Sequence, residues 1–196
     1  MNNKPDYDQL YFIAEGQAGY FTAAQARARG FSWERLSVNA DTGKFLRVSQ
    51  GVYRLTHFPG SAFEDLFIAH LKLGPNSVIS HESALLVYGL SDVLPEEIHL
   101  IVPRTASRRH KGIHIHTNQL KPDEVTTREG LPITTVARTI ADAAISHLPE
   151  EQVRQAIEEA LDRGLVTAEE LILQAERQRG KARLMIQKTF HTEAQK

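Results

Sequence analysis

The chain of 196 residues contains no cysteine. That absence excludes disulfide bonds, thiolate nucleophiles, iron–sulfur clusters and the common zinc fingers. Long apolar runs are missing too, because stretches such as Ile140–Ile145 fall far short of the roughly 20 residues that a membrane-spanning helix needs. The first residues carry no apolar core of the kind that a signal peptide uses. We therefore expect a cytoplasmic protein that makes no contact with a membrane.

Net charge is almost absent as well, since 23 Lys and Arg residues face 24 Asp and Glu residues. The charges are unevenly placed, however. Residues 27–54 hold six basic side chains against two acidic ones, residues 101–121 hold five basic and no acidic ones, and residues 150–170 hold seven acidic against two basic. Because local patches set the field that a partner meets, near-neutrality does not exclude a nucleic-acid binder. The acidic stretch is either a solvated face or a dock for a basic partner.

The apolar spacing divides the chain into two regions. Before residue 58 it predicts helices over Tyr7–Gln17 and Ala23–Arg29, then a third helix capped by Ser32, then a hairpin with strands at Phe45–Val48 and Val52–Leu55. Pro, Gly and Ser interrupt both helix and strand patterns at residues 57–61. Residues 62–196 then mix helical with strand-like runs and end in helices. We expect an α+β protein with domains at 1–58 and 62–196.

The region from Thr22 to Leu36 has the spacing of a helix-turn-helix. That motif needs a small residue where its helices cross, a glycine at the turn and an apolar anchor on the second helix. Ala26, Gly30 and Leu36 stand at the fifth, ninth and fifteenth positions counted from Thr22, as the motif requires. With the hairpin that follows, the pattern predicts a winged helix-turn-helix that binds DNA. The alternative is a helix hairpin with a solvated basic face.

On the DNA-binding interpretation, the second helix of the motif enters the major groove and the hairpin contacts the backbone or the minor groove. Arg35 would pair with guanine and Asn39 with adenine. Trp33 is either part of this exposed surface or a partly buried core residue. The expected DNA-binding residues are Thr22, Ser32, Trp33, Arg35, Asn39, Lys44, Arg47, Ser49, Gln50 and Arg54.

A second basic segment lies between two strand-like runs, Glu97–Val102 and Gly112–His116. As a loop it would add phosphate contacts to a DNA-binding surface. It equally fits a loop that only keeps a strand edge soluble. Its basic residues are Arg104, Arg108, Arg109 and Lys111.

Three histidines fall on these same two strand-like runs. His114 and His116 are two apart on a strand, so both side chains point to one face. With His99 they would make a metal site only if the two strands pair in register. Because no register is guaranteed, solvent-facing or core histidines are the favoured interpretation, and we expect neither a metal nor another cofactor. A metal-dependent nuclease of the restriction type needs an acidic residue and a lysine two apart on a strand. The comparable strand here has the sequence Glu97-Ile-His99, without a lysine. We therefore expect no enzymatic activity.

Several blocks of the sequence resemble one family. The segments at residues 15–26 (EGQAGYFTAAQA) and 47–55 (RVSQGVYRL) look like the N-terminal winged-helix domain of AbiEi-type antitoxins. Further blocks at residues 80–85 (SHESAL), 88–91 (YGLS), 98–104 (IHLIVPR) and 130–139 (GLPITTVART) are similar to the rest of that family. The resemblance spans residues 7 to 144.

This resemblance implies the antitoxin of a type IV toxin–antitoxin operon. Such a protein binds repeats in double-stranded DNA at its own promoter, represses it, and opposes a nucleotidyltransferase-type toxin, classically without a stable complex. The alternatives are a stand-alone winged-helix transcription factor whose second domain senses a ligand, or a metal-dependent nuclease around Glu97, His99, His114 and His116. The sequence does not identify the operator, the oligomeric state or the toxin.

Overall fold

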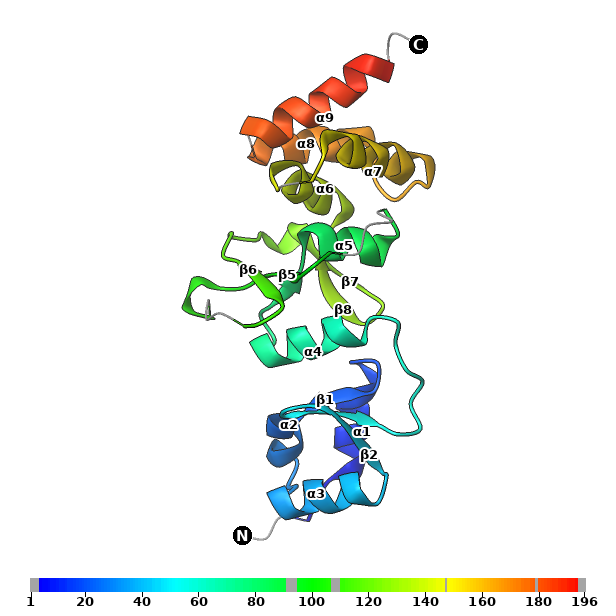
Figure 1. Cartoon of the computed structure of the whole chain (residues 1–196), viewed down its shortest axis with the longest axis vertical. Helices are drawn as coiled ribbons and strands as arrows, with labels where there is room; N and C mark the ends of the chain where they lie inside the picture. The colour runs from blue at the N-terminus through cyan, green and yellow to red at the C-terminus, as the bar shows by residue number, and fades with distance from the viewer. Residues whose placement is uncertain (1–3, 91–94, 107–109, 147, 179, 194–196) are drawn as a thin grey trace. The chain divides into compact units, whose positions relative to one another are not determined.

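The computed structural model describes residues 4–90, 95–106, 110–146, 148–178 and 180–193 (Figure 1). Helices and strands are mixed along the chain, which confirms the α+β class. The chain forms two compact units. The first comprises residues 1–77 together with 129–131, and the second comprises residues 78–128 and 132–196.

The first unit is a group of short helices around an antiparallel sheet of three strands in the order β1-β3-β2 (Figure 1). Its elements are α1 (Tyr7–Glu15), β1 (Tyr20–Thr22), α2 (Ala23–Ala28), α3 (Trp33–Asp41), β2 (Phe45–Ser49), β3 (Val52–Leu55) and α4 (Glu64–Leu73). Side-chain caps fix where the first three helices begin, because Asp6, Thr22 and Ser32 each accept a hydrogen bond from a backbone N–H three residues on.

Aromatic rings fill the core of this unit. Phe21 packs edge-on against Phe45 and is stacked on Tyr53, with ring centroids 5.0 and 5.8 Å apart. Phe31, which lies in the turn between α2 and α3, is buried in the same cluster and anchors that turn. Leu10 from α1 and Leu36 from α3 complete the contact between the helices and the sheet. Burial of this apolar surface is the main term that holds the helices on the sheet.

Helix α4 belongs to the first unit, although the sequence pattern predicted that a second domain begins at residue 62. Tyr20 explains the difference, because its ring stacks on Phe67 at 5.1 Å and its hydroxyl donates a hydrogen bond of 2.8 Å to Glu64. Burial and the Glu64 carboxylate raise the pKa of Tyr20 to about 12. The interruption at residues 57–61 is therefore a loop within the unit, whose first segment ends at Ser77.

The second unit contains a five-stranded mixed sheet in the order β6-β5-β4-β8-β7 and five helices of the described chain (Figure 1). The strands are β4 (Val78–Ile79), β5 (Ile98–Ile101), β6 (Ile113–His116), β7 (Val125–Arg128) and β8 (Leu131–Thr134). The helices are α5 (His81–Tyr88), α6 (Val136–Ile145), α7 (Glu150–Asp162), α8 (Ala168–Gln178) and α9 (Gly180–Glu193). Strand β8 begins at Leu131, which counts with the first unit.

Strand pairing in this sheet places the histidines described below. β5 and β6 run parallel, with His99 opposite His114 and Ile101 opposite His116. The β7–β8 connection is the pair Glu129-Gly130, and both residues have positive φ, at 53° and 81°. Positive φ at both central residues is the requirement of a type I′ hairpin turn.

A buried ionic network holds α6 in place. The guanidinium of Arg138 donates two hydrogen bonds of 2.9 Å to Asp142 and one of 3.0 Å to Glu124. Gln174 of α8 donates to the other oxygen of Glu124 at 2.8 Å. The three charged side chains are at most 5% exposed. Helices α6, α7, α8 and α9 pack against one another in the same unit (Figure 1).

Among the described residues no helix combines the length and the apolar character that crossing a membrane requires.

Candidate nucleic-acid interface

Helix α3 presents an outward face of large and polar side chains. Trp33 is 55% exposed, Val38 is 57% exposed, and Arg35 is also at the surface. The Arg27 guanidinium of α2 lies 4.9 Å from the centre of the Trp33 ring, a cation–π contact that joins the two helices at the surface. Trp33 is thus an exposed residue and not part of the core.

The prediction that Asn39 lies on this exposed face is wrong. Asn39 is only 4% exposed, and its amide donates hydrogen bonds to the backbone oxygen of Arg35 at 2.8 Å and to the Tyr7 hydroxyl at 3.2 Å. The amide ties α3 to α1 from the inner side. A side chain committed in this way does not reach a DNA base.

The capping residues at the starts of the two helices also have internal roles. Thr22 forms a capping box with Gln25, whose side chain accepts a hydrogen bond of 2.7 Å from the Thr22 backbone N–H. Ser32 accepts a hydrogen bond of 3.2 Å from the Arg35 backbone N–H. Between the helices Gly30 has φ 84°, a left-handed conformation that favours glycine. These features fix the angle of the turn, which sets the direction of α3.

The β2–β3 hairpin carries the next group of expected residues. Lys44, Arg47 and Gln50 are exposed, and Ser49 is half-buried at a register shift between Arg47 and Ser49. Such a shift is a local bulge that bends a strand near its end. The hairpin and the residue before it therefore expose two cations and one amide in the same unit as α3.

Arg54 does not extend freely from the hairpin. It is half-buried on the central strand β3, and its Nη1 donates a hydrogen bond of 3.3 Å to the backbone oxygen of Phe58. The guanidinium also lies 6.0 Å from the centre of the Tyr20 ring. The predicted phosphate contact by Arg54 conflicts with these internal contacts, which hold the loop after β3.

The second basic segment lies in the second unit. Arg104 is exposed in a short 3₁₀ turn (Arg104–Ala106) that follows β5, and Lys111 is exposed just before β6. Arg108 and Arg109 lie outside the described residues. The structure therefore gives no geometry for this segment as one surface.

The three histidines that the sequence pointed to lie close together, because the parallel pairing sets His99 opposite His114 and the His114 and His116 rings are 4.6 Å apart. His99 Nδ1 lies 3.1 Å from His116 Nε2, and the buried His81 of α5 joins them. The metal-site hypothesis from the sequence did not include His81, because it combined only the histidines of the two strand-like runs. His114 stacks on His99 at 4.9 Å, but it is exposed and pairs with the equally exposed Glu97 at 3.4 Å. Glu97 thus lies with His114 and not with the three clustered rings.

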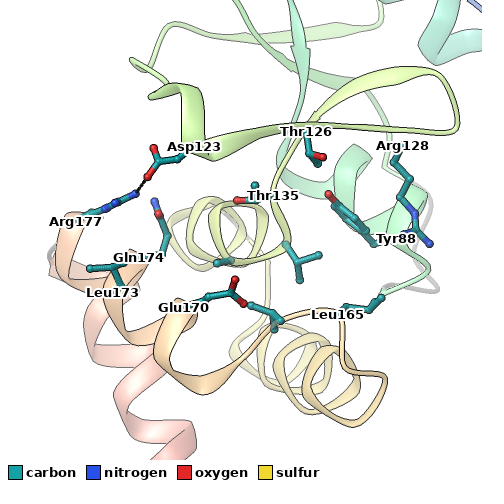
Figure 2. Close-up of a pocket in the computed structure, with 13 residues that line it drawn as sticks. Tyr88, Asp123, Thr126, Arg128, Thr135, Leu165, Glu170, Leu173, Gln174 and Arg177 are labelled. Atoms are coloured by element: carbon teal, nitrogen blue, oxygen red, sulfur yellow. Dashed lines mark ion pairs between the residues drawn. The ribbon is translucent and has the colours of Figure 1, made fainter. Parts of the chain in front are cut away.

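A separate cavity of the second unit has a volume of about 490 Å³ (Figure 2). Arg177 and Asp123 form an ion pair of 2.9 Å on one side of it, and Arg128 lies 5.1 Å from the centre of the Tyr88 ring on the other. The Tyr88 hydroxyl donates to the backbone oxygen of Thr134 at 2.8 Å, and burial raises its pKa to about 12. Asp123, Arg128, Arg177 and Tyr88 are thus each engaged with a partner in the structure.

No protein-family model matches the chain, and no curated protein matches it either. The case for a function therefore depends on the sequence blocks and on the geometry described above.

Proposed function

We propose that the chain is a DNA-binding transcriptional repressor and that its first unit is a winged helix-turn-helix. One observation carries the proposal: α2, a glycine turn and α3 precede a hairpin, and both α3 and the hairpin expose groups that suit DNA. The surface residues are Trp33, Arg35, Lys44, Arg47 and Gln50. The buried residues of the same segments make core contacts, and Thr22 and Ser32 cap the two helices, which together hold α3 rigidly.

The chemistry of the exposed side chains assigns base recognition and phosphate contact to different residues. Arg35 has the bidentate donor geometry that recognises guanine in the major groove. Arg47 and Lys44 supply charge to phosphates, and that contribution is the same on every sequence. Trp33 adds an apolar surface that suits a thymine methyl or a deoxyribose. Specificity then comes from α3, while affinity comes from the hairpin.

We further propose that this repressor is the antitoxin of a type IV operon, opposing a nucleotidyltransferase-type toxin through its second unit. Support comes from the resemblance to AbiEi-type antitoxins, whose later blocks fall on α5, β5 and the β8–α6 segment. On this proposal the protein acts by binding and is not an enzyme. Co-expression with the toxin tests the antitoxin part: growth rescue supports it, and continued toxicity with a soluble chain refutes it.

Fluorescence anisotropy tests DNA binding, with DNA from upstream of the gene compared with a scrambled duplex across a salt series. We expect binding at least about 10³-fold tighter on the upstream DNA, with a steep salt dependence. Equal and weak binding to both duplexes would refute the repressor.

Three variants separate the roles of the surface residues. Arg35→Ala should cost about 1–3 kcal/mol on the upstream DNA and relax base preference. Arg47→Ala should weaken binding to both duplexes alike and flatten the salt slope. Arg154→Ala is the matched control, because Arg154 is an arginine on α7 of the second unit. If Arg35→Ala and Arg47→Ala behave identically on both duplexes, α3 is not the recognition helix.

A further inference from the structure

In the histidine cluster of the second unit, one ring nitrogen faces two polar neighbours that it cannot both satisfy. His99 Nδ1 faces two neighbours at once, since Glu82 Oε2 lies 2.9 Å away and His116 Nε2 lies 3.1 Å away. A neutral imidazole nitrogen carries at most one hydrogen, so it cannot donate to both. Among the described residues, Glu82 Oε2 is a buried side-chain oxygen that has no properly directed hydrogen bond. Leaving a carboxylate oxygen buried in this way is costly.

Burial also shifts the pKa values of the side chains around this contact. Burial, and then the neighbouring His116, lower the pKa of His81 to about 2. Burial, and then His99, lower the pKa of His116 to about 4. Burial raises the pKa of Glu82, but the contact with His99 and the backbone hydrogen bond outweigh it and lower this pKa to about 2.

The backbone brings His81 into this cluster at a cost. His81 is 2% exposed and has φ 51°, in the left-handed region that side-chain-bearing residues rarely adopt. Its ring stacks on His116 with centroids 3.6 Å apart, and its Nδ1 lies 2.9 Å from the Ser80 hydroxyl. Backbone strain of this kind persists where the surroundings hold the residue in place, and it concentrates at functional sites.

We propose that His81, His99 and His116, together with Glu82, bind a divalent transition-metal ion, zinc being the ion that suits them. One nitrogen from each histidine lies within 4.8 Å of the others. Ligands on a tetrahedral zinc at 2.0–2.1 Å stand about 3.4 Å apart. The His99–His116 and His99–Glu82 separations, 3.1 and 2.9 Å, are already close to that value.

A metal ion at this position would give both His99 Nδ1 and Glu82 Oε2 a partner. It satisfies Glu82 Oε2 and the ring nitrogens without any added proton, because metal ligation uses the neutral imidazole and the ionised carboxylate. Three imidazoles and a carboxylate form a donor set suited to zinc and its transition-metal neighbours, not to calcium or magnesium. The ion would join α5, β5 and β6, and the cavity of about 640 Å³ that the cluster lines gives it a path of entry.

The experiment uses the full chain without a polyhistidine tag, stripped with a chelator and titrated with ZnCl₂ by calorimetry. We expect one equivalent to bind, with a rise in the midpoint of thermal unfolding. Cobalt(II) gives a second readout, because coordination by imidazole produces visible absorption bands that free cobalt in water does not show at the same strength. Absence of binding by the stripped, folded chain overturns the proposal.

Matched variants locate the ion. His116→Gln should weaken binding at least 100-fold and abolish the cobalt bands, and Glu82→Gln, which is isosteric, should weaken it about 10–100-fold. His114→Gln is the neighbouring control, since its ring stacks on His99 from an exposed position, and His57→Gln is a control in the first unit. Both controls should bind as the parent chain does.

Circular dichroism of each stripped variant separates lost binding from lost folding. If His116→Gln does not fold, the comparison between Glu82→Gln and His114→Gln still decides the matter. Binding that survives in Glu82→Gln and His116→Gln overturns the proposal, because the ion then sits elsewhere. Binding that falls equally in His114→Gln overturns it as well.

Discussion

Replacing Arg138 by Met should be among the most destabilising single changes in the second unit. The guanidinium is 4% exposed and is shared between Asp142, which is fully buried, and Glu124, which is 5% exposed. Methionine keeps much of the apolar length of the side chain but leaves two buried carboxylates without a counter-charge. Removing one partner of a buried ion pair costs about 3–5 kcal/mol.

For a chain of this size each kcal/mol shifts the unfolding midpoint by about 2–4 °C, so the expected fall is roughly 6–20 °C. Differential scanning calorimetry and urea titration followed by circular dichroism measure it. The loss should depend on pH. Burial raises the pKa of Asp142 and Arg138 opposes that rise, so the variant lets this pKa climb further.

The sign follows from proton counts. An acid whose pKa is higher in the folded chain than in the unfolded chain holds a proton where the unfolded chain has released it. Stability then falls as pH rises through that window, by at most about 1.4 kcal/mol per pH unit for one group. The difference between Arg138→Met and the parent should therefore be larger at pH 8 than at pH 5.

Two further chains test the reasoning. Adding Asp142→Leu to Arg138→Met removes one unpaired carboxylate and should recover part of the lost stability, as a double-mutant cycle would show. Arg154→Met breaks only the exposed pairs with Glu151 and Glu158 and should leave the midpoint nearly unchanged. If Arg138→Met unfolds at the same midpoint as Arg154→Met, the network does not stabilise the fold and the argument fails.

Three other predictions concern the first unit. Thr22→Ala removes the hydroxyl that caps α2 and should cost about 0.5–2 kcal/mol by urea titration, while Thr22→Ser should recover most of it. Burial lowers the pKa of His70, so the unfolded chain binds a proton that the native chain refuses, and stability should fall as pH drops below about 6.5; His70→Gln should flatten that fall, and identical pH profiles would contradict the argument. The carboxylate of Glu34 accepts hydrogen bonds from its own backbone amide and from Ser32, which lower its pKa and keep a negative charge on α3. Glu34→Gln should therefore tighten binding to both duplexes a few-fold in the anisotropy assay. Weaker binding would show that this end of α3 does not face DNA.

Local signals were sufficient for most helices and strands. Thr22 and Ser32 predicted helix starts, and the structure places each of them at a cap. The hairpin around Gln50 and Gly51 forms as expected because glycine permits the φ of 73° that the turn uses. Strand β1 escaped prediction, because three residues are too few to show alternation.

Long-range contacts decided what the sequence could not. Helical spacing placed Asn39 outside, whereas its partner Tyr7 stands 32 residues away and holds the amide inside. The pairing of Tyr20 with Glu64 brings α4 into the first unit across 44 residues. The parallel pairing that sets His99 beside His114 is likewise a matter of tertiary structure. No periodic sequence pattern indicates that His81 of α5 lies beside these strand residues.

The two faces of α3 have a consequence for how this protein changes over evolutionary time. The inner face, with Leu36 and Asn39, is tied to the core, whereas Trp33, Arg35 and Val38 point outward. Substitutions on the outer face leave the buried contacts intact. On the proposed function, a few codons would suffice to retarget such a protein to a new operator without refolding it. Related chains would then share the scaffold while diverging at these positions.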